Sequence, residues 1–321
     1  MKTTVRKLAI IIPTVLLAVA AVTLRTIACL TELDYTTGLF ADSTLARISG
    51  WIAAATAALL LILLPAKLEV FERRVSFRGP LTYLPSGVLG TALILSSVDL
   101  FGYVAAALDG IFTRQLLSRW DCISALLTAL LALCAAGYCI VSALIPTVRS
   151  NLRANLGMLA ALGFACYTVH LFFRADSPLS NPAKTADEMA FLAAALFMLS
   201  ETRLSLGRAR WKDYFVFGSI SAVLCAYSSI PALIIYIFTG EIISASIQQS
   251  ILLLALTIFS ALRLLGVAML DKNRPSSFVT AINSDSLACE EEPVLPEVEE
   301  QSELPQISID DIEEPERQGE E

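Results

Sequence analysis

Charge, histidine and catalytic motifs are all scarce in this sequence. Charged residues make up 17% of the 321 residues, the net charge is −7, and His170 is the only histidine. A lone histidine cannot build a multi-histidine metal site, and the seven cysteines contain no C-x-x-C pair. No H-E-x-x-H, G-x-x-x-x-G-K-S/T or G-x-S-x-G segment is present. We therefore predict no enzyme, no metal, no cofactor and no nucleic-acid partner.

Long apolar runs are abundant, by contrast. Hydrophobic residues make up 56% of the chain and the mean hydropathy is +0.68, values typical of membrane proteins. A helix crosses a bilayer core of about 30 Å with about 20 mostly apolar residues. Eight runs of about this length predict an all-α integral membrane protein, a bundle of about eight transmembrane helices in a lipid bilayer. The predicted spans are 8–24, 48–64, 84–108, 123–145, 156–173, 185–206, 214–238 and 247–270.

Two of these runs leave an alternative open. The first follows three basic residues and therefore also has the form of a signal peptide, although its apolar length favours a retained anchor. The sixth carries Asp187, Glu188 and Glu201 at its margins. It spans the bilayer if these side chains reach the two interfaces, and it is an interfacial helix if they do not.

Lysine and arginine predict the orientation of the spans. With the N-terminus in the cytoplasm, fifteen of them fall on the cytoplasmic side and six on the outer side, as the positive-inside rule requires. Eight spans return the chain to the cytoplasm, so we predict a multi-pass protein of the cell membrane with both termini inside. The longest outer loop contains D-Y-T-T-G-L-F at 34–40, where Gly38 suits the positive φ of a turn. We interpret it as a structural turn, with binding as the alternative.

The composition changes abruptly near residue 274. Residues 275–321 hold fifteen Asp and Glu against Arg317 alone, which leaves +7 on residues 1–274 when −14 is subtracted from −7. Such a segment buries too little apolar surface to offset its ordering entropy. We predict a polytopic transmembrane domain at 1–274 and an acidic, disordered cytoplasmic tail at 275–321. Within the tail, Ile307, Ile309 and Ile312 predict a short motif that orders on binding a cytoplasmic protein partner. The alternative is a solvated spacer that binds no partner.

Ionisable residues inside the predicted spans are candidates for a polar membrane site. Asp99 lies about 13 Å from the outer end of its span at 1.5 Å per residue, which is too deep to reach the interface. His170 and Glu188 lie near the outer ends of their spans, so the three residues form a proton or cation site if their helices are neighbours. The interpretation that we favour is instead that Asp99 joins helices through hydrogen bonds.

Toward the inner side, Glu201 and Arg263 fall at similar predicted depths. We predict that they form an ion pair, because pairing relieves the cost of placing either charge in the membrane. The alternative is an Arg263 that meets an anionic substrate in a hydrated vestibule.

Three short segments carry a resemblance to known sequences. They are D-x-x-T-G-L-F after the first span, S-E-T-R-L-S-L-G-R at 200–208 and S-I-P at 229–231. Together they resemble uncharacterised multi-pass membrane proteins of anaerobic Gram-positive bacteria, over most of the membrane body and not the tail. The resemblance implies a multi-pass fold and no known activity, so no functional residue carries over.

These observations favour a non-enzymatic scaffold, sensor or regulator with a partner-binding acidic tail. The first alternative is a small-solute or ion transporter that uses Asp99. The second is an intramembrane enzyme in which a serine acts with His170.

Overall fold

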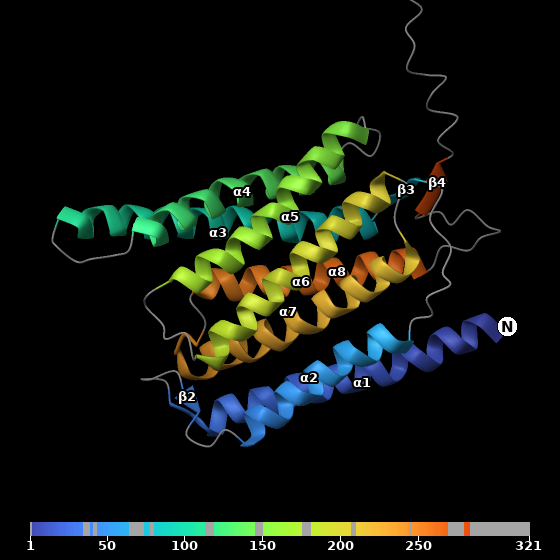
Figure 1. Cartoon of the computed structure of the whole chain (residues 1–321), viewed down its shortest axis with the longest axis horizontal. Helices are drawn as coiled ribbons and strands as arrows, with labels where there is room; N and C mark the ends of the chain where they lie inside the picture. The colour runs from blue at the N-terminus through green and yellow to red at the C-terminus, as the bar shows by residue number, and fades with distance from the viewer. Residues whose placement is uncertain are drawn as a thin grey trace, which may run out of the picture. The chain divides into compact units, whose positions relative to one another are not determined.

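The computed structural model describes residues 2–34, 39–40, 44–63, 74–77, 80–112, 119–144, 150–174, 181–206, 210–243, 246–268 and 279–282. Within this part of the chain, seven of eight helices are long and apolar enough to cross a membrane, and α6 is the exception. An all-α, multi-pass membrane bundle is therefore confirmed. The helices are α1 (Lys2–Thr31), α2 (Thr44–Leu63), α3 (Pro80–Phe112), α4 (Arg119–Leu144), α5 (Ser150–Phe173), α6 (Pro182–Ser205), α7 (Trp211–Thr239) and α8 (Ile247–Ala268) (Figure 1).

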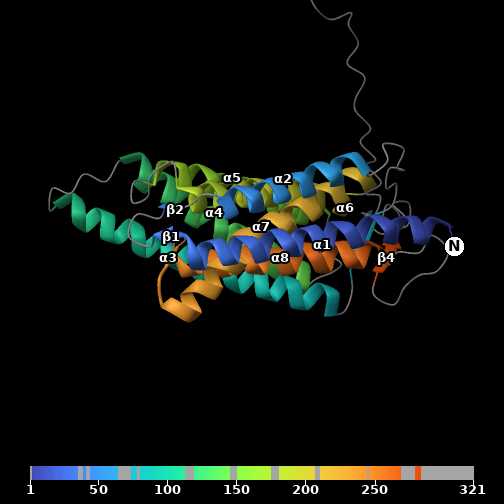
Figure 2. The same cartoon turned by 90° about the horizontal axis from the view of Figure 1, so that it is seen from below.

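Helices α3 to α8 close into a ring. Each packs against the next in chain order, α8 returns to α3, and α6 also touches α8 across the ring. Their buried apolar side chains form one core, which includes Tyr138, Phe164, Phe197 and Phe259. Figures 1 and 2 show these helices running roughly along a common direction. This arrangement places α6, α7 and α8 in mutual contact.

Helices α1 and α2 form a hairpin beside this ring. They pack against each other and reach the ring mainly through α7, along one edge of the bundle (Figure 1). Two small apolar clusters make the connection, one around Ala21, Ala53 and Tyr227 and one around Cys29 and Ile235. The hairpin therefore contacts the ring mainly through one helix, whereas each helix of the ring packs against two neighbours in the ring.

Helix α6 corrects one expectation from the sequence. Its acidic side chains were expected at the two interfaces, yet Asp187 and Glu201 are 2% and 1% exposed inside the bundle. They are buried because α7 and α8 supply polar partners that take the place of water. The helix is capped by Asn181, whose side chain accepts a hydrogen bond from the backbone N–H of Ala183. Helix α6 packs against α5 and α7 in the bundle, although it is less apolar than the seven helices that could cross a membrane.

Two short antiparallel strand pairs complete the described structure. Strand β1 (Leu33–Asp34) pairs with β2 (Leu39–Phe40). Residues 35–38, the centre of the turn predicted at 34–40, lie outside the described residues. Strand β3 (Arg74–Phe77) pairs with β4 (Val279–Ile282), so that Arg74 lies opposite Ile282. Strand β4 falls within 275–321, where the sequence predicts disorder, so the membrane unit extends past residue 274. Residues 284–321 are a separate unit, and the predicted motif at Ile307, Ile309 and Ile312 lies outside the described residues.

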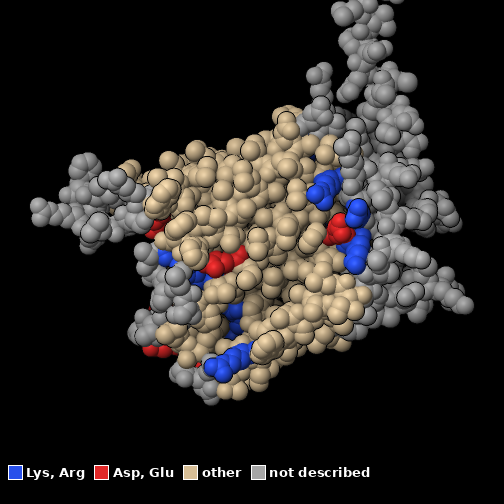
Figure 3. Space-filling view, viewed as in Figure 1, with Lys and Arg blue, Asp and Glu red and all other residues tan. Residues whose placement is uncertain are grey.

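The surface of the bundle is largely uncharged. Large apolar side chains are exposed on several helices, among them Trp51, Ile62 and Phe238. Figure 3 shows a broad face of uncharged residues, with most of the charged side chains nearer the two ends of the helices. Such a surface is unfavourable in water and favourable in lipid, which agrees with a multi-pass location in a membrane.

Candidate functional site

Three neighbouring helices each carry two buried polar residues at the same spacing. The two residues of each pair are 14 positions apart, and the pairs are Asp187 and Glu201 of α6, Tyr214 and Ser228 of α7, and Gln249 and Arg263 of α8. Fourteen residues make about four helical turns and about 21 Å, so both members of a pair lie on one face of their helix. The six side chains meet in two groups. We call Asp187, Ser228 and Gln249 the Asp187 layer, and Glu201, Tyr214 and Arg263 the Glu201 layer.

The Glu201 layer is built around a buried ion pair. Nε of Arg263 lies 3.6 Å from Oε1 of Glu201, and Tyr214 OH donates to Oε2 at 2.6 Å. At the other end of the guanidinium, Nη2 donates to Oγ of Ser86 at 3.3 Å. The guanidinium carbon lies 5.1 Å from the ring centroid of Phe259, and Arg263 is 0% exposed. The structure thus brings together the two residues that the sequence predicts as an ion pair, and their charges compensate each other away from water.

The Asp187 layer holds one charge between neutral donors. Ser228 Oγ donates to Oδ1 of Asp187, and Gln249 Nε2 donates to Oδ2 at 2.8 Å. All three side chains are buried. Hydrogen bonds to a carboxylate are roughly twice as strong as neutral ones, so both donors hold α7 and α8 firmly to α6. Between the two layers, buried apolar residues such as Ala194 and Leu256 fill the space.

A small cavity borders the Asp187 layer where the α1–α2 hairpin meets the ring. Its walls include Arg25 and Cys29 of α1, Asp187 of α6, and Ser228 and Pro231 of α7. A volume of about 10 Å³ leaves room for roughly one water molecule. The cavity is therefore small, and its wall carries one cation and one carboxylate.

Tyr227 connects the hairpin to this layer. The guanidinium of Arg25 lies 4.2 Å from the ring centroid of Tyr227, and Ser49 Oγ lies 3.0 Å from the Tyr227 hydroxyl. Arg25 belongs to α1 and Ser49 to α2, so one side chain contacts both helices of the hairpin. Tyr227 directly precedes Ser228, so the polar contacts of the hairpin lie next to the Asp187 layer along α7.

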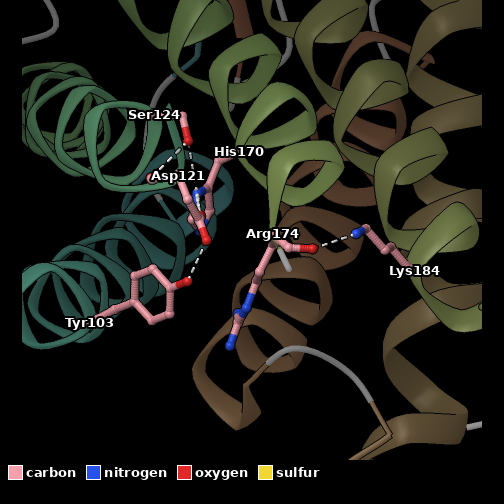
Figure 4. A network of polar contacts seen from close by, with 6 residues as sticks. All are labelled: Tyr103, Asp121, Ser124, His170, Arg174 and Lys184. Carbon is pink, nitrogen blue, oxygen red and sulfur yellow. Dashed lines mark hydrogen bonds and ion pairs between the residues drawn. The ribbon is translucent and has the colours of Figure 1, made fainter. Parts of the chain in front are cut away.

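A third polar group surrounds His170 where α3, α4 and α5 meet (Figure 4). Nδ1 of His170 lies 3.6 Å from Oδ1 of Asp121 and 3.2 Å from Oγ of Ser124. Tyr103 OH donates to Oδ2 of Asp121 at 2.7 Å, and the guanidinium of Arg174 lies 5.1 Å from the Tyr103 ring centroid. Asp121 lies in the first turn of α4, where the helix dipole favours a carboxylate.

A lysine links this group to α6. Lys184 Nζ donates to the backbone carbonyl of Arg174 at 2.8 Å (Figure 4). Lys184 lies one helical turn before Asp187, so the end of α5 is tied to the start of α6 close to the Asp187 layer.

The His170 group does not have the arrangement of a Ser-His-Asp nucleophile. In such a triad the serine and the carboxylate bind opposite nitrogens of the imidazole. Here Ser124 and Asp121 both face Nδ1 (Figure 4), and Nε2 has no hydrogen-bond partner within the described part of the chain. Ser124 also donates to the backbone carbonyl of Asp121 at 2.9 Å. This geometry suits polar contacts that join helices better than it suits a Ser-His dyad.

The predicted site of Asp99, His170 and Glu188 is not assembled as expected. Among the described residues, no hydrogen bond or ion pair joins these three side chains to one another. The carboxylate beside His170 is Asp121, because α4 packs between α3 and α5. Asp99 is only partly buried on α3, within electrostatic reach of Tyr167, and Glu188 is partly buried on α6.

Sequence reasoning missed the residues that complete the two layers. Ser228 and Gln249 are neutral and resemble ordinary polar positions. The carboxylate of the His170 group was missed as well, because Asp121 falls just before the fourth predicted span. The common 14-residue spacing in the last three helices was the available signal. It became meaningful only once the helices were known to be neighbours.

No known protein family, curated protein or solved structure matches this chain. Over the residues that the structure describes, no three His, Cys, Asp or Glu side chains come together in a way that could hold a metal ion. The fold and site together define a multi-pass helical membrane protein whose last three helices are joined by two buried polar layers.

Proposed function

We propose that this protein is a non-enzymatic membrane sensor or regulator in which α6, α7 and α8 relay a conformational change along the bundle. The observation that carries the proposal is that the same three helices are joined twice, by layers about 21 Å apart. Helices are stiff over this length and the apolar core between the layers is close-packed. A displacement at one layer therefore changes the geometry of the other.

The Asp187 layer is the entry point in this proposal. It borders the cavity, and Tyr227 connects it to the hairpin, whose packing against the ring is limited. A stimulus that shifts the hairpin would first disturb Arg25 and Tyr227 and then Ser228. The Glu201 layer is the receiving end, because its ion pair strongly favours one relative position of α6 and α8.

The acidic tail is the output element in this proposal. We place both termini in the cytoplasm of a cell membrane, on the strength of the fifteen basic residues that this orientation puts inside. Ile307, Ile309 and Ile312 would then present a motif to a cytoplasmic protein partner. In intact cells, a Lys212→Cys variant should be protected from a membrane-impermeant thiol reagent. Labelling from outside would contradict the orientation.

A distance measurement between labels at the Glu201 end tests the relay. Spin labels carried by unnatural amino acids at the exposed positions of Arg203 on α6 and Leu265 on α8 leave the seven cysteines intact. We expect Asp187→Asn to change the distance distribution between these labels in full-length protein in lipid nanodiscs, although the substitution lies about 21 Å away.

The matched control is Glu188→Gln, the same chemical change at the neighbouring, partly exposed residue. It should leave the distribution unchanged. If Asp187→Asn also leaves it unchanged while the protein stays folded, the relay is wrong.

Transport is the second candidate, and one observation favours it. Asp187 is a buried carboxylate at the wall of a cavity with room for about one water molecule, which suits a proton or small cation. Proteoliposomes tested for proton and sodium flux separate the candidates. Flux that is lost in Asp187→Asn and kept in Asp99→Asn would support transport through Asp187. Flux that is lost only in Asp99→Asn would support the site predicted from the sequence. Absence of flux in the wild-type protein would argue against transport and leave the relay as the proposed function.

A further inference from the structure

Helix α4 carries two buried hydroxyl groups that have no hydrogen-bond partner in the described part of the chain. Tyr138 is 0% exposed and Ser142 is 2% exposed. Within the described residues, neither Tyr138 OH nor Ser142 Oγ has a hydrogen-bond partner. They lie four positions apart and therefore on the same face of the helix. Buried hydroxyls are nearly always hydrogen-bonded, so two on one face indicate a ligand or water between them and their neighbours.

Among the described residues, the charged groups that act on Tyr138 have a net positive charge. Tyr138 lies within electrostatic reach of Arg153, Arg263 and Glu201, which together carry one net positive charge. Glu201 already accepts from Tyr214 and faces Arg263. Arg153 belongs to the first turn of α5, and its buried Nε has no hydrogen-bond partner among the described residues.

We infer that Tyr138, Ser142 and Arg153 form a binding site for an oxyanion, namely a phosphate group. The three side chains offer N–H and O–H donors and no carboxylate, and an arginine guanidinium matches the geometry of phosphate oxygens. A phosphodiester carries one negative charge, which balances the single net positive charge of Arg153, Arg263 and Glu201. The inference does not depend on the relay, since it concerns α4 and α5.

The site lies close to the end of the bundle. Ser142 is two residues before the end of α4, and Arg153 is four residues into α5, where its side chain is partly exposed. Phosphate can therefore arrive either as a lipid headgroup at the membrane interface or as free phosphate from water. Both sources present the same oxygen atoms to the same donors.

Thermal unfolding of delipidated, full-length protein in a phosphorus-free maltoside detergent tests the site. Phosphatidylglycerol or inorganic phosphate is added, and the midpoint temperature is followed with the concentration of each. We expect the midpoint to rise with the probe that binds. A rise with the lipid alone assigns the site to headgroups, and a rise with both assigns it to phosphate from either source.

Three variants make the test specific. Arg153→Gln and Tyr138→Phe should each weaken binding of the effective probe roughly tenfold, because each removes a hydrogen bond to an anion. Arg203→Gln is the matched control, an exposed arginine in the last turn of α6, and it should bind like the wild type. Equal responses of all variants, or no rise with either probe, would overturn the inference. In the latter case a Tyr138→Phe variant that is less stable than the wild type identifies a water site.

Discussion

The Asp187 and Glu201 layers use the same three helices at the same spacing but hold them together differently. In the Glu201 layer, a buried carboxylate faces a buried guanidinium. In the Asp187 layer, an equally buried carboxylate accepts hydrogen bonds from two neutral donors and borders a small cavity that Arg25 of the hairpin also lines. One carboxylate therefore meets its cation inside the layer. The other is hydrogen-bonded by neutral groups of its layer, and the cation on its cavity wall, Arg25, belongs to the hairpin.

Removing the arginine of the Glu201 layer should have the largest effect. Arg263→Met leaves Glu201 buried without its cation, so we expect the free energy of unfolding to fall by about 3–5 kcal/mol. The exposed control Arg203→Met should cost less than about 0.5 kcal/mol. Steric trapping in bicelles measures both.

A double variant then shows whether the loss belongs to the pair. In Glu201→Met with Arg263→Met no charge is left stranded, so the double variant should lose less stability than Arg263→Met alone. Additive losses from the two single variants would mean that the two charges do not interact.

The Asp187 layer should be the more tolerant of the two. Asp187→Asn keeps one acceptor oxygen but removes the charge, so we expect a loss of about 1–2 kcal/mol. The same unfolding measurement, with Glu188→Gln as the control, compares this loss with that of the Glu201 layer. A loss as large as that of Arg263→Met would erase the distinction between the layers.

The sequence predicted the helices better than it predicted their contacts. Apolar runs are local features, so all eight helices were expected close to where they lie, and the pairing of Glu201 with Arg263 followed from their similar depths. Burial of Asp187 could not be read in the same way. Its partners Ser228 and Gln249 are on other helices, and only the packing of α6 against α7 and α8 shows that a charge at that position is satisfied.

The same limit applies to His170. The sequence grouped Asp99, His170 and Glu188 on the condition that their helices are neighbours, which a single sequence does not reveal. The structure places α4 beside α5, and Asp121 reaches the imidazole from the first turn of α4. Helix adjacency is a non-local property that apolar periodicity does not encode.

The contact between hairpin and ring should respond weakly to loss of one hydroxyl. Tyr227→Phe removes the hydrogen bond to Ser49 and keeps the ring beneath Arg25, so we expect a loss of about 0.6 kcal/mol. Hydrogen exchange should rise in α2 and remain unchanged in α4. An equal rise in both helices would mean that the hairpin does not move independently of the ring.

Substitution of Asp99 should have the smallest effect on the free energy of unfolding. The result shows whether Asp99 contributes to the stability of the bundle. Its side chain is partly exposed, and no hydrogen bond or ion pair joins it to His170 or Glu188 among the described residues. Asp99→Asn therefore leaves no buried partner stranded, and the free energy of unfolding should change by less than about 0.5 kcal/mol. Ser97→Ala, a buried position on the same helix, is the comparison, because it removes the hydrogen bond that Ser97 donates to the backbone carbonyl of Leu93 at 2.7 Å and touches no charge. A loss above about 1 kcal/mol in Asp99→Asn would place this carboxylate among the structural contacts of α3 and would revive the hydrogen-bonding role considered for it from the sequence.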